Sequence, residues 1–315
     1  MSASTLVFER YWYLGIVFKS IIYGLVLYIS FNTIHLLYHD PSPSRSQLNR
    51  RVLIAYVVVI VVLMTISIVA NALLGQNMWI ENRDHPGGPY GYYTATAADW
   101  INVAGTASVM FGNFIGDALL LYRCYIIWNS NLYIVVLPFL IFLGSTALSI
   151  VSLVHSALPG ADFFGRNSVD FAIPWIALTC GLNILLTGLI TCRILGARRE
   201  LNRITNSQEL SQVYTGVIAI LVESALPFSI LGIVLAALLG AGNRVYTLFV
   251  NLWGSYVGLA PLLIIHRVAL GKAWSKETAR DINSTQLHFA PPPIDIALRE
   301  RDPEKAQPGS SIMSG

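Results

Sequence analysis

Seven long apolar runs follow one another along this chain and constrain its fold more than any other feature. They cover residues 14–38, 52–74, 101–128, 132–155, 171–192, 213–239 and 246–266. Each is long enough to cross a bilayer as a helix, which takes about 20 residues. None shows the apolar–polar alternation of a strand. Because backbone polar groups in lipid must be paired within each segment, the runs predict an all-α, polytopic membrane bundle of seven transmembrane helices.

The composition supports a membrane protein. Of the 315 residues, 55% are hydrophobic and only 12% are charged, whereas a soluble protein carries about 25% charged residues. So little charge excludes a single soluble domain. The net charge of +3 indicates no nucleic-acid partner. The partner that the composition predicts is the lipid bilayer.

Basic residues between the runs predict the orientation of the bundle. Arg and Lys are frequent after the first, fifth and seventh runs, whereas each connection on the other side holds one, namely Arg83, Arg166 or Arg244. Loops rich in Arg and Lys stay in the cytosol. We therefore expect an extracellular N-terminus over residues 1–13, a transmembrane domain over 14–266 and a cytosolic tail over 267–315. The tail is expected to be disordered after about residue 290.

Charged residues inside the predicted spans are costly in lipid and are candidates for function. Asp117 lies eleven residues before the end of the third run, and Glu223 lies ten residues after the start of the sixth. These helices run in opposite directions with a rise of about 1.5 Å per residue, so both carboxylates are expected about 15 Å from the cytosolic ends. We expect Lys19, near the outer end of the first helix, to extend its ammonium to the lipid headgroups.

Two amide side chains are expected close to these carboxylates. Asn113 lies one turn from Asp117, and Asn183 has a similar depth in the fifth run. One hypothesis is a polar core, or ligand site, that links the third, fifth and sixth helices through Asp117, Glu223, Asn113 and Asn183. The alternative is that each carboxylate separately joins two helices.

A second group of candidates is basic and lies near the predicted cytosolic side. Arg123 either reaches the inner headgroups or contacts a cytosolic partner. The candidate coupling surface for a signalling partner consists of Arg123, Arg193, Arg198 and Arg199.

Prolines and motifs complete the list of candidates. Pro227 and Pro261 fall inside the sixth and seventh runs, where proline predicts a helix kink.

The three cysteines lack metal-ligand spacing and are expected to be buried. Zinc-protease, nucleophile-elbow and phosphate-loop motifs are missing from the sequence. We therefore expect a protein that is not an enzyme and has no cofactor and no metal.

Several strings resemble a known family. They are Gly-Asp-Ala-Leu-Leu-Leu-Tyr-Arg-Cys-Tyr-Ile-Ile-Trp at 116–128, Asn183 with Thr187 and Arg193, Glu-Ser-Ala at 223–225, and Ala-Pro-Leu-Leu-Ile-Ile-His-Arg-Val-Ala-Leu-Gly at 260–271. They resemble the seven-helix membrane proteins of mushroom-forming basidiomycetes, which are often described as receptor-like. The resemblance implies a fungal membrane protein with seven helices and names no ligand.

The predicted layout is also similar to that of G-protein-coupled receptors. The chain differs from rhodopsin-like receptors in three respects: the outer loops lack cysteine, Tyr122-Arg123-Cys124 replaces the acidic-Arg-Tyr triplet, and the seventh run lacks Asn-Pro-x-x-Tyr. The similarity is one of architecture, which leaves function open.

Three functions remain open from the sequence. The first is a receptor-like protein of the plasma membrane that senses a small or lipidic ligand in its outer half and signals through its basic inner loops. The second is a proton-linked transporter or exporter of a hydrophobic or protonatable solute, with Asp117 and Glu223 as protonation sites. The third is a membrane scaffold without a ligand.

Overall fold

The computed structural model describes residues 3–39, 46–129, 131–158, 166–204 and 208–288. The regular secondary structure of these residues is helical throughout: α1 (Ala3–Tyr38), α2 (Ser46–Gln76), the π-helix η1 (Asn77–Glu81), α3 (Gly88–Ala95), α4 (Trp100–Ile127), α5 (Leu132–Ala157), α6 (Arg166–Ile204), α7 (Gln208–Gly240) and α8 (Tyr246–His288). The chain divides into two compact units, Met1–Ala273 and Trp274–Gly315. In the second unit, the described residues 274–288 are helical, and the predicted disorder after residue 290 lies outside the described residues.

Seven of the described helices are long and apolar enough to cross a membrane. The spans are Thr5–Tyr38, Arg50–Glu81, Trp100–Ile127, Leu132–Ala157, Asp170–Gly196, Val222–Gly240 and Tyr246–Arg267. They coincide with the seven apolar runs, which confirms the predicted all-α multi-pass bundle. The helices extend past several runs, since α1 begins at Ala3 rather than residue 14 and α6 continues to Ile204 rather than 192. An apolar run marks the lipid-embedded part of a helix, and the helix itself continues into polar surroundings.

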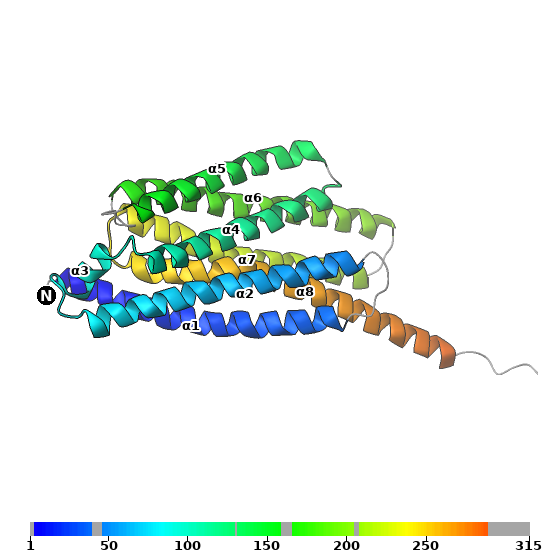
Figure 1. The fold of residues 1–315 in the computed structure, drawn as a ribbon. Helices are drawn as coiled ribbons and strands as arrows, with labels where there is room; N and C mark the ends of the chain where they lie inside the picture. The colour runs from blue at the N-terminus through cyan, green and yellow to red at the C-terminus, as the bar shows by residue number, and fades with distance from the viewer. Residues whose placement is uncertain (1–2, 40–45, 130, 159–165, 205–207, 289–315) are drawn as a thin grey trace, which may run out of the picture. The chain divides into compact units, whose positions relative to one another are not determined.

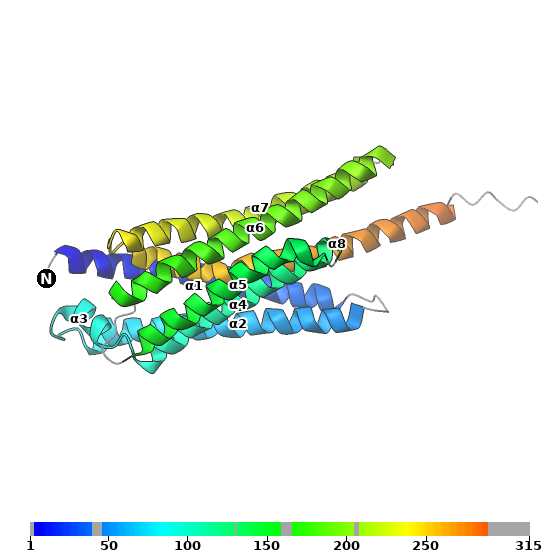
Figure 2. The ribbon, with the colours of Figure 1, turned by 90° about the horizontal axis from the view of Figure 1, so that it is seen from above.

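The first unit is a bundle in which neighbours in sequence pack side by side. Contacts join α1 to α2, α2 to α4, α4 to α5, α5 to α6 and α6 to α7, and α4 also packs on α6. Figures 1 and 2 show α3 at the end of this bundle where α1 begins; we call it the α3 end. In α8, 67% of the most apolar 18-residue stretch is buried inside the bundle, whereas the corresponding share is 44% or less in each of the other spans. The eighth helix is therefore the centre of the bundle.

Glycines allow close approach at two helix contacts, one where α6, α7 and α8 meet and one between α2 and α4. A Cβ atom on Gly232 of α7 would collide with Cys180 Sγ of α6 and would lie 2.9 Å from Trp253 Nε1 of α8. A Cβ on Gly105 of α4 would lie 2.7 Å from Ala70 Cβ of α2. Close backbone approach of this kind is how membrane helices gain packing energy without a hydrophobic driving force.

The short helix α3 covers part of the α3 end and was not anticipated from the sequence. It follows Gly87, whose φ of 88° favours glycine. The Tyr93 ring lies 5.2 Å from Phe8 and 5.0 Å from Trp12, both on α1. The Arg244 guanidinium, in the α7–α8 connection, lies 4.3 Å from the Tyr90 ring. Aromatic and cation–π contacts therefore hold α3 against α1 and against this connection.

Candidate functional site

Asp117 lies in α4 and forms a closed hydrogen-bonded group with two neighbours. Its side chain is only 4% exposed. Asn113 Nδ2 donates to Asp117 Oδ2 at 3.0 Å, and Thr179 Oγ1 of α6 donates to the same oxygen at 2.7 Å. Asn113 Nδ2 also donates to Thr179 Oγ1 at 2.8 Å. The group joins α4 to α6 and gives the buried carboxylate the partners that burial requires.

A small cavity adjoins this group and is called the Asp117 cavity below. It contains about 380 Å³ of space between atoms, and its lining includes Asp117, Asn113, Asn183, Ser224 and Pro261. These residues come from α4, α6, α7 and α8. The Asn183 Oδ1 atom is buried and has no hydrogen-bond partner among the described residues. The structure thus brings Asp117, Asn113 and Asn183 together at the predicted junction of helices.

Glu223 does not line this cavity, so the structure does not bring the two carboxylates together in one polar core. The Glu223 side chain is exposed on α7. Its neighbour Ser224 is 3% exposed and lines the Asp117 cavity. One residue on a helix corresponds to a rotation of about 100°. Glu223 therefore has the expected depth along α7 but points to the outside of the bundle.

The basic candidates lie in different surroundings. Arg123 is partly buried and interacts electrostatically with Tyr56 of α2. Arg193 is exposed, with its guanidinium 5.4 Å from the Trp128 ring. Arg199 is exposed, and the side chain of Arg198 lies outside the described part of the chain. Their role in coupling to a cytosolic partner stays a prediction.

The prolines are incorporated into continuous helices. Pro227 is partly buried in α7, and Pro261 is buried in α8 and lines the Asp117 cavity. Whether either proline acts as a hinge stays a prediction.

Two of the three cysteines behave as expected. Cys124 and Cys180 are buried, whereas Cys192 is exposed on α6, contrary to the prediction. An apolar residue near the end of a span faces lipid as readily as it faces the bundle. Within the described residues, the structure contains no group of three or more His, Cys, Asp or Glu placed to hold a metal.

A larger cavity lies nearer the α3 end and is called the α3-end pocket. It contains about 1050 Å³ of space between atoms, part of it open to the surroundings. Every spanning helix contributes to its wall, and α3 contributes Tyr93. One residue from each of the seven spans illustrates this: Trp12, Asn71, Thr106, Ser156, Trp175, Leu235 and Asn251.

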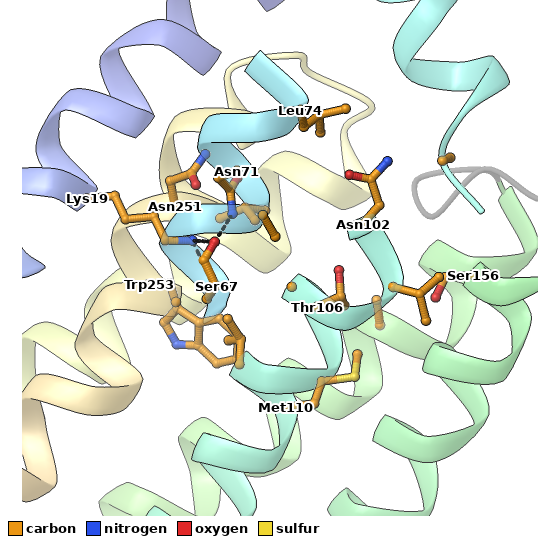
Figure 3. Close-up of a pocket in the computed structure, with 18 of the residues that line it drawn as sticks. Lys19, Ser67, Asn71, Leu74, Asn102, Thr106, Met110, Ser156, Asn251 and Trp253 are labelled. Atoms are coloured by element: carbon orange, nitrogen blue, oxygen red, sulfur yellow. Dashed lines mark hydrogen bonds between the residues drawn. The ribbon is translucent and has the colours of Figure 1, made fainter. Parts of the chain in front are cut away.

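Lys19, Ser67, Asn71 and Asn251 lie close together on one side of this pocket, and Asn102, Thr106 and Ser156 lie apart from them on α4 and α5 (Figure 3). Lys19 Nζ of α1 donates to Ser67 Oγ of α2 at 2.9 Å and lies 3.5 Å from the Ser67 carbonyl oxygen. Asn71 Nδ2 donates to that carbonyl oxygen at 2.8 Å. Asn251 Nδ2 of α8 donates to the Thr247 carbonyl oxygen at 3.0 Å. These bonds hold the polar side chains of α1, α2 and α8 in position on the wall.

The position of Lys19 corrects the prediction that its ammonium reaches the headgroups. The side chain is only 6% exposed, and it points into the bundle toward α2. The hydroxyl of Ser67 on α2 accepts a hydrogen bond from the Lys19 ammonium at 2.9 Å. A buried acceptor on the neighbouring helix therefore outweighs the tendency of lysine to extend outward.

The α3-end pocket was not predicted from the sequence, although the spacing of polar and aromatic residues in two of the helices gives a weak indication of it. Trp12 and Lys19 are seven residues apart, and so lie on one face of α1. Ser67 and Asn71 are four residues apart and share a face of α2 in the same way. The signal is weak because many spans contain single polar residues, and only the packing of all seven helices brings these together.

Comparison with known proteins gives no further guide to this site. No family model matches the chain, and no curated protein or solved structure matches it. Function must therefore be inferred from the geometry of the two cavities.

Proposed function

We propose that this integral membrane protein is a receptor-like sensor whose small ligand binds in the α3-end pocket. The observation that carries the proposal is that all seven spanning helices contribute residues to this one pocket. A ligand there contacts every helix at once. Any difference in its affinity for two arrangements of the bundle shifts the population between them, which is what a sensor requires.

The chemistry of the wall supports a ligand site. Aromatic side chains from four elements surround the pocket, namely Trp12, Tyr93, Trp175 and Trp253, and the polar residues are confined to a few positions. Small-molecule sites have this composition, with an apolar wall and a small number of placed polar groups. The Asp117 cavity is smaller, and its carboxylate is already bonded to Asn113 and Thr179. It suits helix packing better than ligand binding.

The predicted orientation completes the proposal. With the N-terminus outside, the α3-end pocket lies in the outer half of a plasma-membrane protein, and the basic residues around Arg193 face a cytosolic signalling partner. The resemblance to receptor-like seven-helix proteins of basidiomycetes agrees with this arrangement.

An exposed cysteine provides a reporter for the test. Cys192 is exposed, whereas Cys124 and Cys180 are buried, and it lies four residues from the end of its span at Gly196. A membrane-permeant thiol-reactive fluorophore is therefore expected to label Cys192 ahead of the two buried cysteines. Cys192 lies sixteen residues after Ile176, which lines the pocket, or about 24 Å along α6. A change in emission on ligand binding therefore reports a rearrangement transmitted along the helix.

The experiment uses the full chain labelled at Cys192, in nanodiscs, with three probes that differ in headgroup: octanoate, 1-octanol and octylamine. At least one probe is expected to change the emission saturably. Thr106→Trp, which fills the pocket, should abolish the change. Phe111→Trp is the matched control, because Phe111 is 51% exposed on the same helix. The proposal fails if all three probes leave the emission unchanged, or if the Thr106→Trp variant responds like the wild type.

A flux measurement separates the receptor from the transporter. Proteoliposomes with an imposed pH gradient should accumulate none of the three probes beyond protein-free liposomes. Gradient-driven uptake that is lost in the Asp117→Asn variant would instead support the transporter.

A further inference from the structure

One charged side chain lines the α3-end pocket among the described residues, and it is a cation. Lys19 is the only Lys, Arg, Asp or Glu in the lining. The acceptors for its ammonium are two oxygens of one neutral residue, Ser67. The described residues supply no carboxylate to pair with it. Lys19 is thus a nearly buried amine whose protein partners carry no negative charge, so an anion placed beside it would favour its charged form.

An unpaired buried cation is unfavourable for the empty protein. Charged side chains within a membrane bundle normally pair with an opposite charge or line a functional cavity. Hydrogen bonds to a hydroxyl and a carbonyl compensate only part of the lost hydration. A ligand that brings a negative charge to Lys19 supplies the missing partner, and charge-assisted hydrogen bonds are about twice as strong as neutral ones.

The rest of the pocket favours an apolar body on that ligand. Met110, Trp175, Ile176, Leu235 and Leu239 line it together with the polar residues. Trp175 and Trp253 pack edge to face, with ring centroids 5.4 Å apart. Lys19, Ser67 and Asn71 lie close together in the close-up (Figure 3), while Met110 lies away from them on α4. The lining therefore offers the Lys19 amine at one place and apolar side chains at others, with Asn102, Thr106 and Ser156 as further polar groups.

We propose that the α3-end pocket binds an amphipathic anion, whose carboxylate or comparable anionic headgroup pairs with Lys19 Nζ and whose apolar body packs against Met110, Trp175 and Leu235. The inference rests on the proposed function of this pocket as the ligand site. It adds the chemical class of the ligand and the residue that selects it.

The test compares binding of the three octyl probes to the purified full chain in phosphatidylcholine nanodiscs. Octanoate should bind at least tenfold more tightly than 1-octanol or octylamine. Lys19→Gln should weaken octanoate binding about tenfold or more, because a hydrogen bond between charged groups is about twice as strong as one between neutral groups. The same variant should leave 1-octanol unchanged. Lys19→Arg, which keeps the charge, should retain a preference for octanoate.

Three controls keep the outcomes distinct. Size-exclusion chromatography and thermal unfolding establish that each variant is folded. Leu235→Ala, on the apolar wall, should weaken octanoate and 1-octanol alike. Nanodiscs that contain phosphatidylglycerol identify the source of the anion: loss of octanoate binding there indicates an anionic bilayer lipid, and unchanged binding indicates a soluble carboxylate. Both results support the anion subsite.

Two results would overturn the inference. One is octanoate binding that is unaffected by Lys19→Gln in a folded protein. The other is binding of 1-octanol or octylamine that equals that of octanoate in the wild type. In either case the pocket remains a ligand site and only the anion preference is lost. If none of the probes binds, the proposed function itself fails.

Discussion

The two cavities of the bundle each contain one buried ionisable side chain, a carboxyl in one and an amine in the other, and the two differ in their hydrogen-bond partners. Asp117 accepts two hydrogen bonds, from Asn113 on its own helix and from Thr179 on α6. Lys19 donates to oxygens of a single residue, Ser67. Asp117 borders a space of about 380 Å³ and Lys19 borders one of about 1050 Å³, and both spaces are partly open to the surroundings.

The difference separates a structural polar group from a group available to a ligand. A buried charge with several internal partners joins helices and contributes to the stability of the bundle. A buried charge with few partners beside a large cavity reduces stability and gains a partner when a ligand binds. Substitutions at the two sites should therefore have effects of opposite sign on stability.

The largest effect on stability is expected at Asp117. Asp117→Ala leaves the donors on Asn113 and Thr179 without their carboxylate, and an unsatisfied buried polar group costs about 1–3 kcal/mol. The unfolding midpoint in detergent should fall accordingly, while octanoate binding to the folded fraction stays unchanged. Asp117→Asn keeps an acceptor oxygen and should lose less. An equal loss in the two variants would contradict the hydrogen-bonded role.

Lys19→Met should have the opposite sign. The substitution replaces an unpaired cation by an apolar side chain of similar length, so stability should stay constant or rise, by at most about 2 kcal/mol, as is common when a functional group is removed. Octanoate binding should be lost at the same time. Thermal unfolding without and with octanoate measures both effects. A destabilisation similar to that of Asp117→Ala would show that Lys19 is structural.

Glu223→Gln should change stability little. The side chain is exposed, and such substitutions usually stay within about 0.5 kcal/mol. The double variant Asp117→Asn/Glu223→Gln should equal the sum of the single variants, because groups without shared partners are additive. A coupling free energy between the two substitutions well above about 0.5 kcal/mol in a double-mutant cycle would support a polar cluster shared by the two carboxylates.

The smallest perturbation tests access to the α3-end pocket, with a buried residue outside both cavities as the control. Thr106 is partly buried and lines the α3-end pocket, whereas Ser145 of α5 is 3% exposed. In a Cys192→Ser background, Thr106→Cys should react with a charged thiosulfonate and Ser145→Cys should not. Octanoate should slow the reaction at Thr106→Cys several-fold. Equal reactivity at the two positions would show that the α3-end pocket is closed.

The outcome for Glu223 shows how far sequence reasoning reaches in a membrane bundle. The depth of a residue follows from counting along an apolar run, and Asp117 and Ser224 do line one cavity, as the counting predicts. Counting does not reveal on which side of the helix a residue lies, because the side that faces lipid and the side that faces the bundle are both apolar. A soluble helix reveals its buried face by polarity, whereas α7 has exposed leucine and isoleucine at Leu226 and Ile230.

The same reason explains the reversed expectations for Lys19 and Cys192. The position of Lys19 along its helix indicates whether its side chain could extend to the headgroups. It does not reveal the acceptor Ser67 on α2, which lies near Lys19 only because the two helices pack together. Cys192 belongs to an apolar run and yet faces outward. The short helix α3 was also missed, since eight residues between two spans carry no apolar period, and its place depends on aromatic contacts with α1.

The sequence by itself determined that the chain forms seven membrane-spanning helices, because a run of about 20 apolar residues in lipid has no other way to pair its backbone. It also determined the depth of each buried charge, because a helix rises by a constant distance per residue. Only the tertiary structure decided which charges share a cavity and which residues line the α3-end pocket. Those outcomes depend on the rotation of each helix about its axis. Side-chain packing among the seven helices determines this rotation, and an apolar stretch of sequence does not reveal it.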